Sequence, residues 1–536
     1  MALIDRPTIR RAVQNIATWG DTDVLPFPID NHIMRDKESA IVELIEKIAK
    51  DFNAFIDDDP VHFYSTLSPV GYTGFRWVTQ IDPMWNAYLL SLAVSLAPAI
   101  EDRRRPTAER NVFSYRYQPN GDASLFNRDG WRQFQTETRL QAENHAYVVS
   151  VDIADFYSRV YHHRLENGLR RIDPGATRTK HIMEILKRLS NNTSYGLPVG
   201  GPAARIMSEL VLNSVDYLLM AEPRIGAFCR YADDYRFFVN DTQTAHRTLG
   251  FISEKLLRNE GLSLQKSKTR IMTSSEYLSI LDPPNPPAGS ASKFLGLHIH
   301  YDPYSDTADQ DYETLKGQLA QFDILGLLRS ELTKGRIHTA LTKRLIGAIE
   351  YMEPEPRQRA VLSLLDNIET LSPVIPQVMQ ATRHFLDGSE DTEFTLEVHR
   401  RVRDLIDSSP IANIDLNLAY MIRVLAGSQS MENEFLFNRL FNTAHGFESF
   451  PALTLRRDII LAMARWGVTP WLSDQKSSIS SAHPWLRRAF IVASFSLGDE
   501  GQHWRRAVSN GLRPFDHIVK DWMADRSQSS SWKVPI

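Results

Sequence analysis

With 536 residues, 43% of them hydrophobic, the chain is long enough for about two to four domains with substantial cores. A single cysteine, Cys229, excludes internal disulfide bonds and suits a reducing cytoplasm, where we expect it to be a small core residue. The net charge of −4 is unusual for an enzyme that clamps a long nucleic-acid duplex.

The N-terminal region contains no segment that suggests export or a membrane anchor. The first residues lack the apolar core of a signal peptide. The longest apolar run, residues 87–100, is about 14 residues long and too short to cross a bilayer. It predicts a buried helix that is closed by Pro98 and by the basic run 103–105. We therefore expect a cytoplasmic protein with no membrane partner.

A first acidic motif follows an apolar strand in the middle of the N-terminal half. Residues 147–153 predict a buried, β-branched strand, and Asp152 lies inside it. A carboxylate in such a strand is costly unless it is paired or bound to a metal ion. Asp155, Phe156 and Tyr157 lead from the strand into a helix-like segment, residues 158–170. The alternative role for an acid here is a helix cap, which would suit Asp155 well.

A glycine-rich turn comes next, at residues 196–202. It feeds a predicted helix over residues 203–219, and Pro202 suits the first turn of that helix. Its glycines would allow the backbone to approach a nucleotide closely.

The second acidic motif is the sequence Arg-Tyr-Ala-Asp-Asp-Tyr-Arg at residues 230–236. Apolar runs at 227–229 and 237–239 predict a β-hairpin with Asp233 and Asp234 at its tight turn. Two neighbouring carboxylates repel one another unless cations neutralise them, although such a pair also occurs in simple solvated turns. If this hairpin lies beside the strand that holds Asp152, three carboxylates could surround two metal ions about 4 Å apart.

Two later segments complete an ordered set of motifs. Lys268 and Thr269 lie beyond the acidic hairpin, and Phe294, Leu295 and Gly296 follow a proline-rich loop over residues 282–289. In this order the motifs resemble the palm of reverse transcriptases. The resemblance covers residues 1–305 and implies an α/β palm-and-fingers fold that uses deoxynucleoside triphosphates and two Mg²⁺ ions, with Mn²⁺ as a substitute.

The same resemblance implies a role for each matching residue. Asp152, Asp233 and Asp234 would be the catalytic metal ligands, and Tyr157 would be the steric gate that excludes ribonucleotides. The nucleotide would also contact Asp155, Phe156, Arg116, Pro198, Gly200 and Lys268, with Arg116 and Lys268 as the cations on the triphosphate. Phe294, Leu295 and Gly296 would form the primer grip.

Two departures from the reverse transcriptase pattern point to a narrower family. Val199 and Gly201 stand where a glutamine and a serine are usual, and valine cannot replace the hydrogen bonds of the glutamine amide. The segments 112–116 and 196–205 resemble the abortive-infection (Abi) polymerases of bacteria, especially their prophage-encoded branch. That resemblance implies untemplated DNA synthesis, priming on the protein itself, a covalently attached single-stranded product and defence against phage. It does not identify the priming residue: Tyr64, Tyr72 and Tyr88 are three hydroxyls among many.

The pattern changes near residue 305 and becomes helical almost throughout. Apolar residues recur at spacings of three and four, and prolines fall where helices would have to end. We expect about ten helices of 12–20 residues in a domain over 306–536 that replaces a thumb. Successive antiparallel pairs would form a HEAT-like solenoid, with a plain helical bundle as the alternative. Its apolar stripes suggest contacts between subunits of a homo-oligomer.

Two other functions remain open on sequence grounds. One is an RNA-templated, retron-like reverse transcriptase, against which Val199 argues. The other is a non-catalytic helical scaffold with a relic palm, against which the retained aspartates and Lys268 argue. His298 and His300 could share one strand face, and we expect His162 and His163 to form a polar helix face, without a metal role for either pair.

Overall fold

The computed structural model describes residues 2–119, 123–281, 294, 315–319, 321–387, 389–447, 449–479, 482–529 and 532–536. The chain divides into two compact units. The first comprises Met1–Ser65, Trp77–Pro284 and Leu512–Trp522, and the second comprises Thr66–Arg76, Asn285–Gly511 and Met523–Ile536. The domain boundary predicted at residue 305 lies outside the described residues and stays a prediction.

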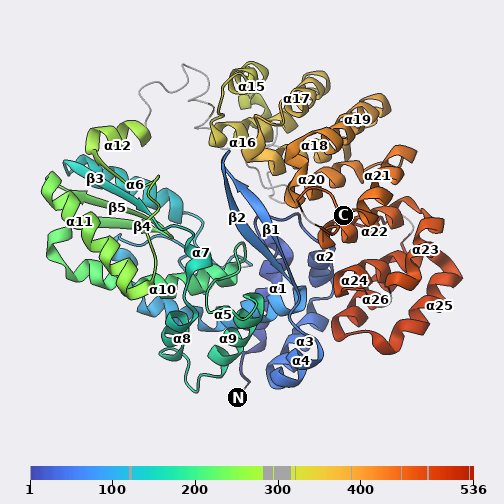
Figure 1. Ribbon diagram of the computed structural model, residues 1–536, viewed down its shortest axis with the longest axis horizontal. Coiled ribbons are helices and arrows are strands. Elements are labelled where there is room, and N and C mark those ends of the chain that lie inside the picture. The colour runs from blue at the N-terminus through green and yellow to red at the C-terminus, as the bar shows by residue number, and fades with distance from the viewer. Residues whose placement is uncertain are drawn as a thin grey trace. The chain divides into compact units, whose positions relative to one another are not determined.

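The first unit begins with helices and a β-hairpin and continues as an α/β body (Figure 1). Near its C-terminal end, the Trp522 indole donates a hydrogen bond to Asp36 (2.7 Å), which ties this late segment to the N-terminal helices. Its elements are α1 (Arg6–Trp19), α2 (Ile29–Asp36), α3 (Glu38–Lys50), α4 (Phe52–Asp58), β1 (Phe63–Val70), β2 (Gly74–Ile81), α5 (Pro83–Arg103), η1 (Thr107–Glu109), α6 (Gly130–Glu143), β3 (Tyr147–Asp152), α7 (Phe156–Arg159), α8 (His162–Arg170), α9 (Thr177–Leu189), α10 (Pro202–Ala221), η2 (Pro223–Ile225), β4 (Ala227–Tyr231), β5 (Asp234–Val239), α11 (Thr242–Lys255), η3 (Leu256–Glu260), β6 (Arg270–Thr273) and α12 (Ser274–Leu281).

A four-stranded antiparallel sheet forms the centre of this body, in the order β4-β5-β3-β6. The predicted strand and hairpin are confirmed as β3 and as β4–β5, joined by a two-residue turn. Strands β3 and β5 are direct neighbours, and Asp152 lies opposite Asp234 at the end of their ladder. The sheet therefore brings together the two acidic motifs that are far apart in the sequence.

Side chains alternate between the two faces of the sheet along each strand, and helices cover the apolar side chains on both faces. On one face, Phe238, Val148 and Cys229 pack with residues of α6 and α12. Burial raises the pKa of the Cys229 thiol, as expected for a core cysteine. On the other face, Tyr235 and Phe237 stack on each other, and α10 and α11 lie beneath them.

A buried ionic network joins α10 to the hairpin. The fully buried Arg230 guanidinium donates two hydrogen bonds to Asp216, at 2.9 and 2.6 Å, and two to Glu209, at 2.9 and 3.4 Å. It also donates to the Ala232 carbonyl (3.1 Å), in the turn that carries Asp233. Arg104 donates to the same Glu209 at 2.7 Å. Two cations and two anions therefore balance below the acidic turn.

Helix α5 is longer than the sequence predicted. It continues through the exposed Pro98 and ends at Arg103, so the expected break at this proline was wrong. Of the residues that the structure describes, this helix is the one long and apolar enough to cross a membrane. Because 83% of its apolar window is buried inside the protein, it is better explained as a core helix.

The second unit is helical wherever it is described, apart from its share of the β1–β2 hairpin. Helices α16, α18, α20, α22 and α24 pack one on the next, while α15, α17 and α19 form a similar series beside them. The described helices are 9–17 residues long, shorter at the lower end than predicted. They are α15 (Ile324–Leu332), α16 (Thr339–Ala348), η4 (Ile349–Tyr351), α17 (Pro354–Asp366), η5 (Ser372–Val374), α18 (Ile375–Asp387), α19 (Thr392–Ser408), η6 (Pro410–Asn413), α20 (Asp415–Leu425), α21 (Met431–Asn442), α22 (Leu453–Trp466), α23 (Thr469–Ile479), α24 (Pro484–Ala493), η7 (Ser494–Leu497), α25 (Gly498–Val508), η8 (Ser509–Gly511) and α26 (Pro514–Arg526), the last of which crosses from the first unit into the second.

Prolines in this half mark the starts of helices rather than their ends. Pro354 and Pro484 are the first residues of α17 and α24, and Pro376 and Pro470 lie in the first turns of α18 and α23. The first helical N–H groups have no partner within the helix, so a residue without that donor is tolerated there.

Replacing Arg230 with leucine should destabilise the first unit strongly, because Glu209 and Asp216 would remain as buried charges without their shared cation. We expect a loss of about 3–5 kcal/mol in the free energy of unfolding, measured by urea denaturation. Arg258→Leu is the matched control: that side chain is 77% exposed and pairs with Glu254 on the surface, so its change should stay within about 0.5 kcal/mol. Equal effects of the two substitutions would contradict this account of the network.

Candidate active site

The three predicted carboxylates meet at one end of the central sheet. Asp152 is the last residue of β3, Asp234 is the first residue of β5, and Asp233 lies in the turn before it. The Ile153 N–H donates to the Asp233 carbonyl (3.2 Å), which holds the turn against β3. Ala232, the other turn residue, has a φ of +51°, a left-handed conformation that non-glycine residues seldom adopt.

Lys268 reaches the same cluster. Its Nζ donates to Asp152 Oδ2 at 2.8 Å, and the Gln265 N–H donates to the Asp152 carbonyl at 2.8 Å. Although partial burial opposes it, the hydrogen bond and charge of Asp152 raise the pKa of Lys268. Lys268 therefore lies at the acidic cluster, and its predicted contact with a triphosphate stays a prediction.

The electrostatics of the cluster favour a bound cation. Burial, with the charges of Asp152 and Asp234, raises the pKa of Asp233 to about 6. Burial also raises the pKa of Asp152 against the opposing effect of Lys268. Carboxylate oxygens are the ligands that Mg²⁺ prefers, and a divalent cation would relieve this repulsion. In the conformation described, however, no three His, Cys, Asp or Glu side chains of the described residues converge closely enough to hold an ion.

The loop over residues 196–202 lies against three other segments through its backbone. The N–H of Leu197 donates to the Tyr157 carbonyl (2.8 Å), and the Val199 carbonyl accepts from Thr79 of β2 (3.2 Å). Gly200 has a φ of +119°, and a Cβ there would collide with Oγ1 of Thr22. In this structure the loop closely approaches the protein's own N-terminal segment, and the expected approach to a nucleotide stays a prediction.

The His162 side chain also contacts this loop. Its Nε2 lies 2.7 Å from the Gly196 carbonyl, its side chain is buried, and burial lowers its pKa. The expectation of a polar, solvated helix face was therefore wrong for this histidine, because a neighbour in the fold rather than in the sequence encloses it.

The steric-gate candidate, Tyr157, lies at the start of α7 beside this loop. Its hydroxyl is buried near Ser208 and Tyr115, and burial raises its pKa well above the ordinary value. Phe156 is buried beside it, whereas Asp155 is exposed and has a φ of +48°.

Comparison with known proteins agrees with this arrangement. The family model described as reverse transcriptase (RNA-dependent DNA polymerase) matches residues 104–299, a range that includes all three carboxylates and the loop. The chain contains a reverse transcriptase domain.

Among solved structures, the chain is similar to a telomerase from Candida albicans in complex with a TWJ fragment of telomeric RNA, with 10% identity and a TM-score of 0.32 over 67% of this chain and 70% of that one. It is also similar to an apo telomerase from Candida tropicalis, with 10% identity and a TM-score of 0.31 over 66% of this chain and 67% of that one. No curated protein matches the sequence.

Two predicted residues of the reverse transcriptase domain have contacts that do not favour their expected roles. The buried Arg116 guanidinium is bound to Glu101 (2.7 Å) and to the carbonyls of Val112 and Arg105, so it offers no free fork to a triphosphate. Phe294 is buried among apolar residues of the helical unit. Leu295 and Gly296 lie outside the described residues, so the primer grip stays a prediction.

Arg205 lies near the site, although the sequence alone assigned it no role. It lies in the first turn of α10, its guanidinium is 5.4 Å from the Tyr115 ring centroid, and it forms an ion pair with Asp23. An arginine within the helix that follows the glycine-rich loop was a signal available in the sequence, but its two partners are distant along the chain.

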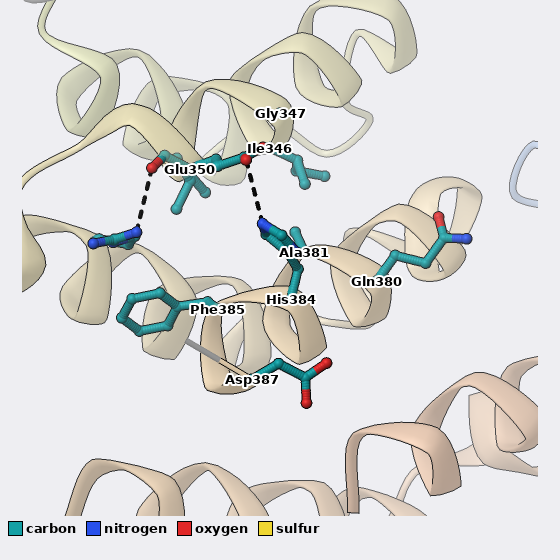
Figure 2. A pocket seen from close by; sticks show the side chains of 10 residues that line it. Ile346, Gly347, Glu350, Gln380, Ala381, His384, Phe385 and Asp387 are labelled. Atoms are coloured by element: carbon teal, nitrogen blue, oxygen red, sulfur yellow. Dashed lines mark hydrogen bonds and ion pairs between the residues drawn. The ribbon is translucent and has the colours of Figure 1, made fainter. Parts of the chain in front are cut away.

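A separate cavity of about 540 Å³ lies within the helical unit (Figure 2). Nε2 of His384 is 3.2 Å from Glu350, and the Arg357 guanidinium is 4.5 Å from the Phe385 ring centroid. The hydrogen bond to Glu350 raises the pKa of His384. The charged groups in this cavity are already paired, and none of the predicted site residues lines it.

The raised pKa of Asp233 makes the metal-free fold sensitive to pH. Its folded pKa, about 6, exceeds its ordinary value of 3.8, so the folded state binds the proton more tightly than the unfolded state. The contribution of Asp233 to the free energy of unfolding is therefore complete below pH 4. It is lost as the pH rises through 6, by about 3 kcal/mol in total. Measured in EDTA, the free energy of unfolding should fall more steeply with pH for the wild type than for Asp233→Asn. Parallel curves would contradict the raised pKa.

Proposed function

We propose that this protein is a reverse transcriptase-like DNA polymerase that adds deoxynucleotides by two-metal catalysis. The observation that carries the proposal is the pairing of Asp152 with Asp234, beside Asp233, inside a reverse transcriptase domain. Asp152 and Asp233 would flank both Mg²⁺ ions, with Asp234 in support. A bound metal pair supplies charge to activate the attacking hydroxyl and to stabilise the leaving pyrophosphate. The ladder between β3 and β5 holds these carboxylates at one end of the sheet.

We further propose that synthesis needs no template. The Val199 side chain has no amide, and its backbone carbonyl is already bound to Thr79, so this residue offers no side-chain hydrogen bond to a template-paired nucleotide. Beside it, a groove of about 230 Å³ is lined by Trp77 and Tyr195, which are 54% and 51% exposed. Exposed aromatic rings suit the stacking of unpaired bases.

Protein priming and phage defence are the remaining parts of the proposal. Two tyrosines considered from the sequence are poorly placed for priming, because their hydroxyls are engaged. Tyr88 is fully buried with its hydroxyl 2.6 Å from His181, and the Tyr72 hydroxyl donates to the Thr370 carbonyl (2.9 Å). The helical half would serve as a HEAT-like solenoid that encloses the product strand and joins subunits of a homo-oligomer. We propose that DNA synthesis of this kind acts in abortive-infection defence.

The central experiment combines purified protein with Mg²⁺ and labelled deoxynucleotides without template, followed by denaturing gels before and after protease. We expect labelled DNA that stays with the protein until protease releases it. Asp233→Asn should abolish the signal, because it removes a charged metal ligand without changing shape. The control is Asp404→Asn, a change in a surface pair with Arg400 on α19.

Each alternative predicts a different outcome of that experiment. Product that migrates freely on the denaturing gel would reject protein priming. Synthesis only after addition of RNA would favour a templated, retron-like enzyme. Full activity of Asp233→Asn would reject the assignment of the metal ligands, and inactivity of the wild type under all conditions would favour a scaffold with a relic palm.

Substituting Tyr157 with alanine should relax sugar selection, if its ring excludes the 2′-hydroxyl. We expect the ratio of ribonucleotide to deoxynucleotide incorporation to rise on the order of 10- to 100-fold, measured with each substrate in parallel. Tyr217→Ala is the control, since that tyrosine is exposed and its ring lies beside Arg105. An unchanged ratio in Tyr157→Ala would remove the gate.

A further inference from the structure

The pair of Arg205 and Asp23 lies beside aromatic side chains next to the acidic turn. The Arg205 guanidinium lies over Tyr115 at 5.4 Å, and Tyr157 and Tyr231 are close enough to contribute to its electrostatic environment. Tyr115 in turn lies 5.9 Å from Tyr231, the residue two positions before Asp233. The Arg205 side chain is 27% exposed, so solvent and substrate can reach it.

Other cations near the cluster already pair with carboxylates of the cluster or of the core. Lys268 is bound to Asp152, and Arg236 lies 3.3 Å from Asp234. The guanidinium groups of Arg104, Arg116 and Arg230 are buried in ion pairs of the core. Arg205 differs because its partner, Asp23, is 55% exposed and comes from a loop rather than from the sheet. An exposed carboxylate is readily replaced by another anion.

Hydrogen bonds of the surrounding backbone nevertheless hold the segment that carries Asp23 in place. The Asp23 N–H donates to the Gly200 carbonyl (3.4 Å), and the neighbouring Asp21 accepts a hydrogen bond from the Gln80 side chain (2.9 Å). Position 201 also lies against this segment, since a Cβ on Gly201 would come within 3.3 Å of the Asp21 carbonyl. The protein therefore presents one of its own carboxylates to an arginine at the edge of the site.

We propose that Arg205 binds a phosphate group of the nucleic-acid substrate and that Asp23 occupies this arginine until the substrate displaces it. This inference rests on the proposed polymerase function and names a phosphate contact of that same site. A guanidinium presents a planar fork that matches phosphate as well as carboxylate, and the Arg205 guanidinium lies over the Tyr115 ring at 5.4 Å from its centroid. The phosphate belongs either to the incoming nucleotide or to the growing strand.

A purely structural role for the pair of Arg205 and Asp23 predicts a different effect on substrate binding when the charge of Asp23 is removed. If Asp23 served only to fasten its loop to α10, removing its charge would loosen the loop and leave substrate binding unchanged or weaker. If Asp23 competes with phosphate, removing its charge must strengthen binding. The sign of the effect therefore separates the two explanations.

The test measures equilibrium binding to the full-length protein, with Ca²⁺ in place of Mg²⁺ to prevent turnover. One arm uses labelled dATP with inorganic tripolyphosphate as competitor, and the other uses a labelled single-stranded oligodeoxynucleotide. Asp23→Asn should tighten binding in one arm by about two- to five-fold, the range set by exposed ion pairs. Arg205→Gln should weaken the same arm, and Asp23→Asn should add nothing when combined with it. The arm that responds identifies the source of the phosphate.

Controls make the outcome specific. Asp407→Asn removes a carboxylate that is 54% exposed and paired with Arg439 in the helical unit, and it should change neither arm. Thermal melting of each variant separates lost binding from lost folding, and Arg205→Lys keeps the charge without the fork. Unchanged or weaker binding of both ligands to Asp23→Asn would overturn the inference even if the protein makes DNA. Tighter binding to that variant without any DNA synthesis would support the phosphate site and reject the polymerase proposal.

Discussion

The buried ion pair network around Arg230 is the interaction on which the acidic turn depends. Arg230 belongs to β4, its two acidic partners belong to α10, and it also holds the Ala232 carbonyl. Although burial alone would raise the pKa of Glu209, the charges of Arg104 and Arg230 lower it, so this carboxylate stays ionised. A buried charge without its partner is far more costly than the intact pair. The network therefore fixes a helix, a strand and the turn with Asp233 relative to one another.

The acidic cluster next to this neutral network carries more negative than positive charge. Three carboxylates share one end of the sheet, and among the described cations Lys268 and Arg236 approach them directly. The fold accepts the repulsion there because the strands are held elsewhere, by their ladder and by the apolar contacts on both faces. A divalent cation would relieve this repulsion between like charges.

The sequence predicted the elements with short-range signals and missed the contacts that only the fold creates. Strand β3, the hairpin around Asp233 and helix α10 follow from apolar runs, a tight turn and a proline at a helix start. No local sequence signal indicates that the buried His162 side chain contacts the Gly196 carbonyl, or that the Arg116 guanidinium pairs with Glu101. Likewise, Asp23 and Arg205 meet only because the N-terminal segment docks on the glycine-rich loop.

This docking also explains how the loop can keep its place while its side chains vary. Its position depends on backbone groups of Gly196, Leu197, Val199 and Gly200, and on the space that Gly200 leaves for Thr22. The side chain at position 199 takes no part in these hydrogen bonds, so a glutamine and a valine could occupy it within the same backbone. The carboxylates, in contrast, are set by the register of β3 and β5. Because different parts of the fold hold these two sets of residues, the side chain at position 199 can change without moving the carboxylates.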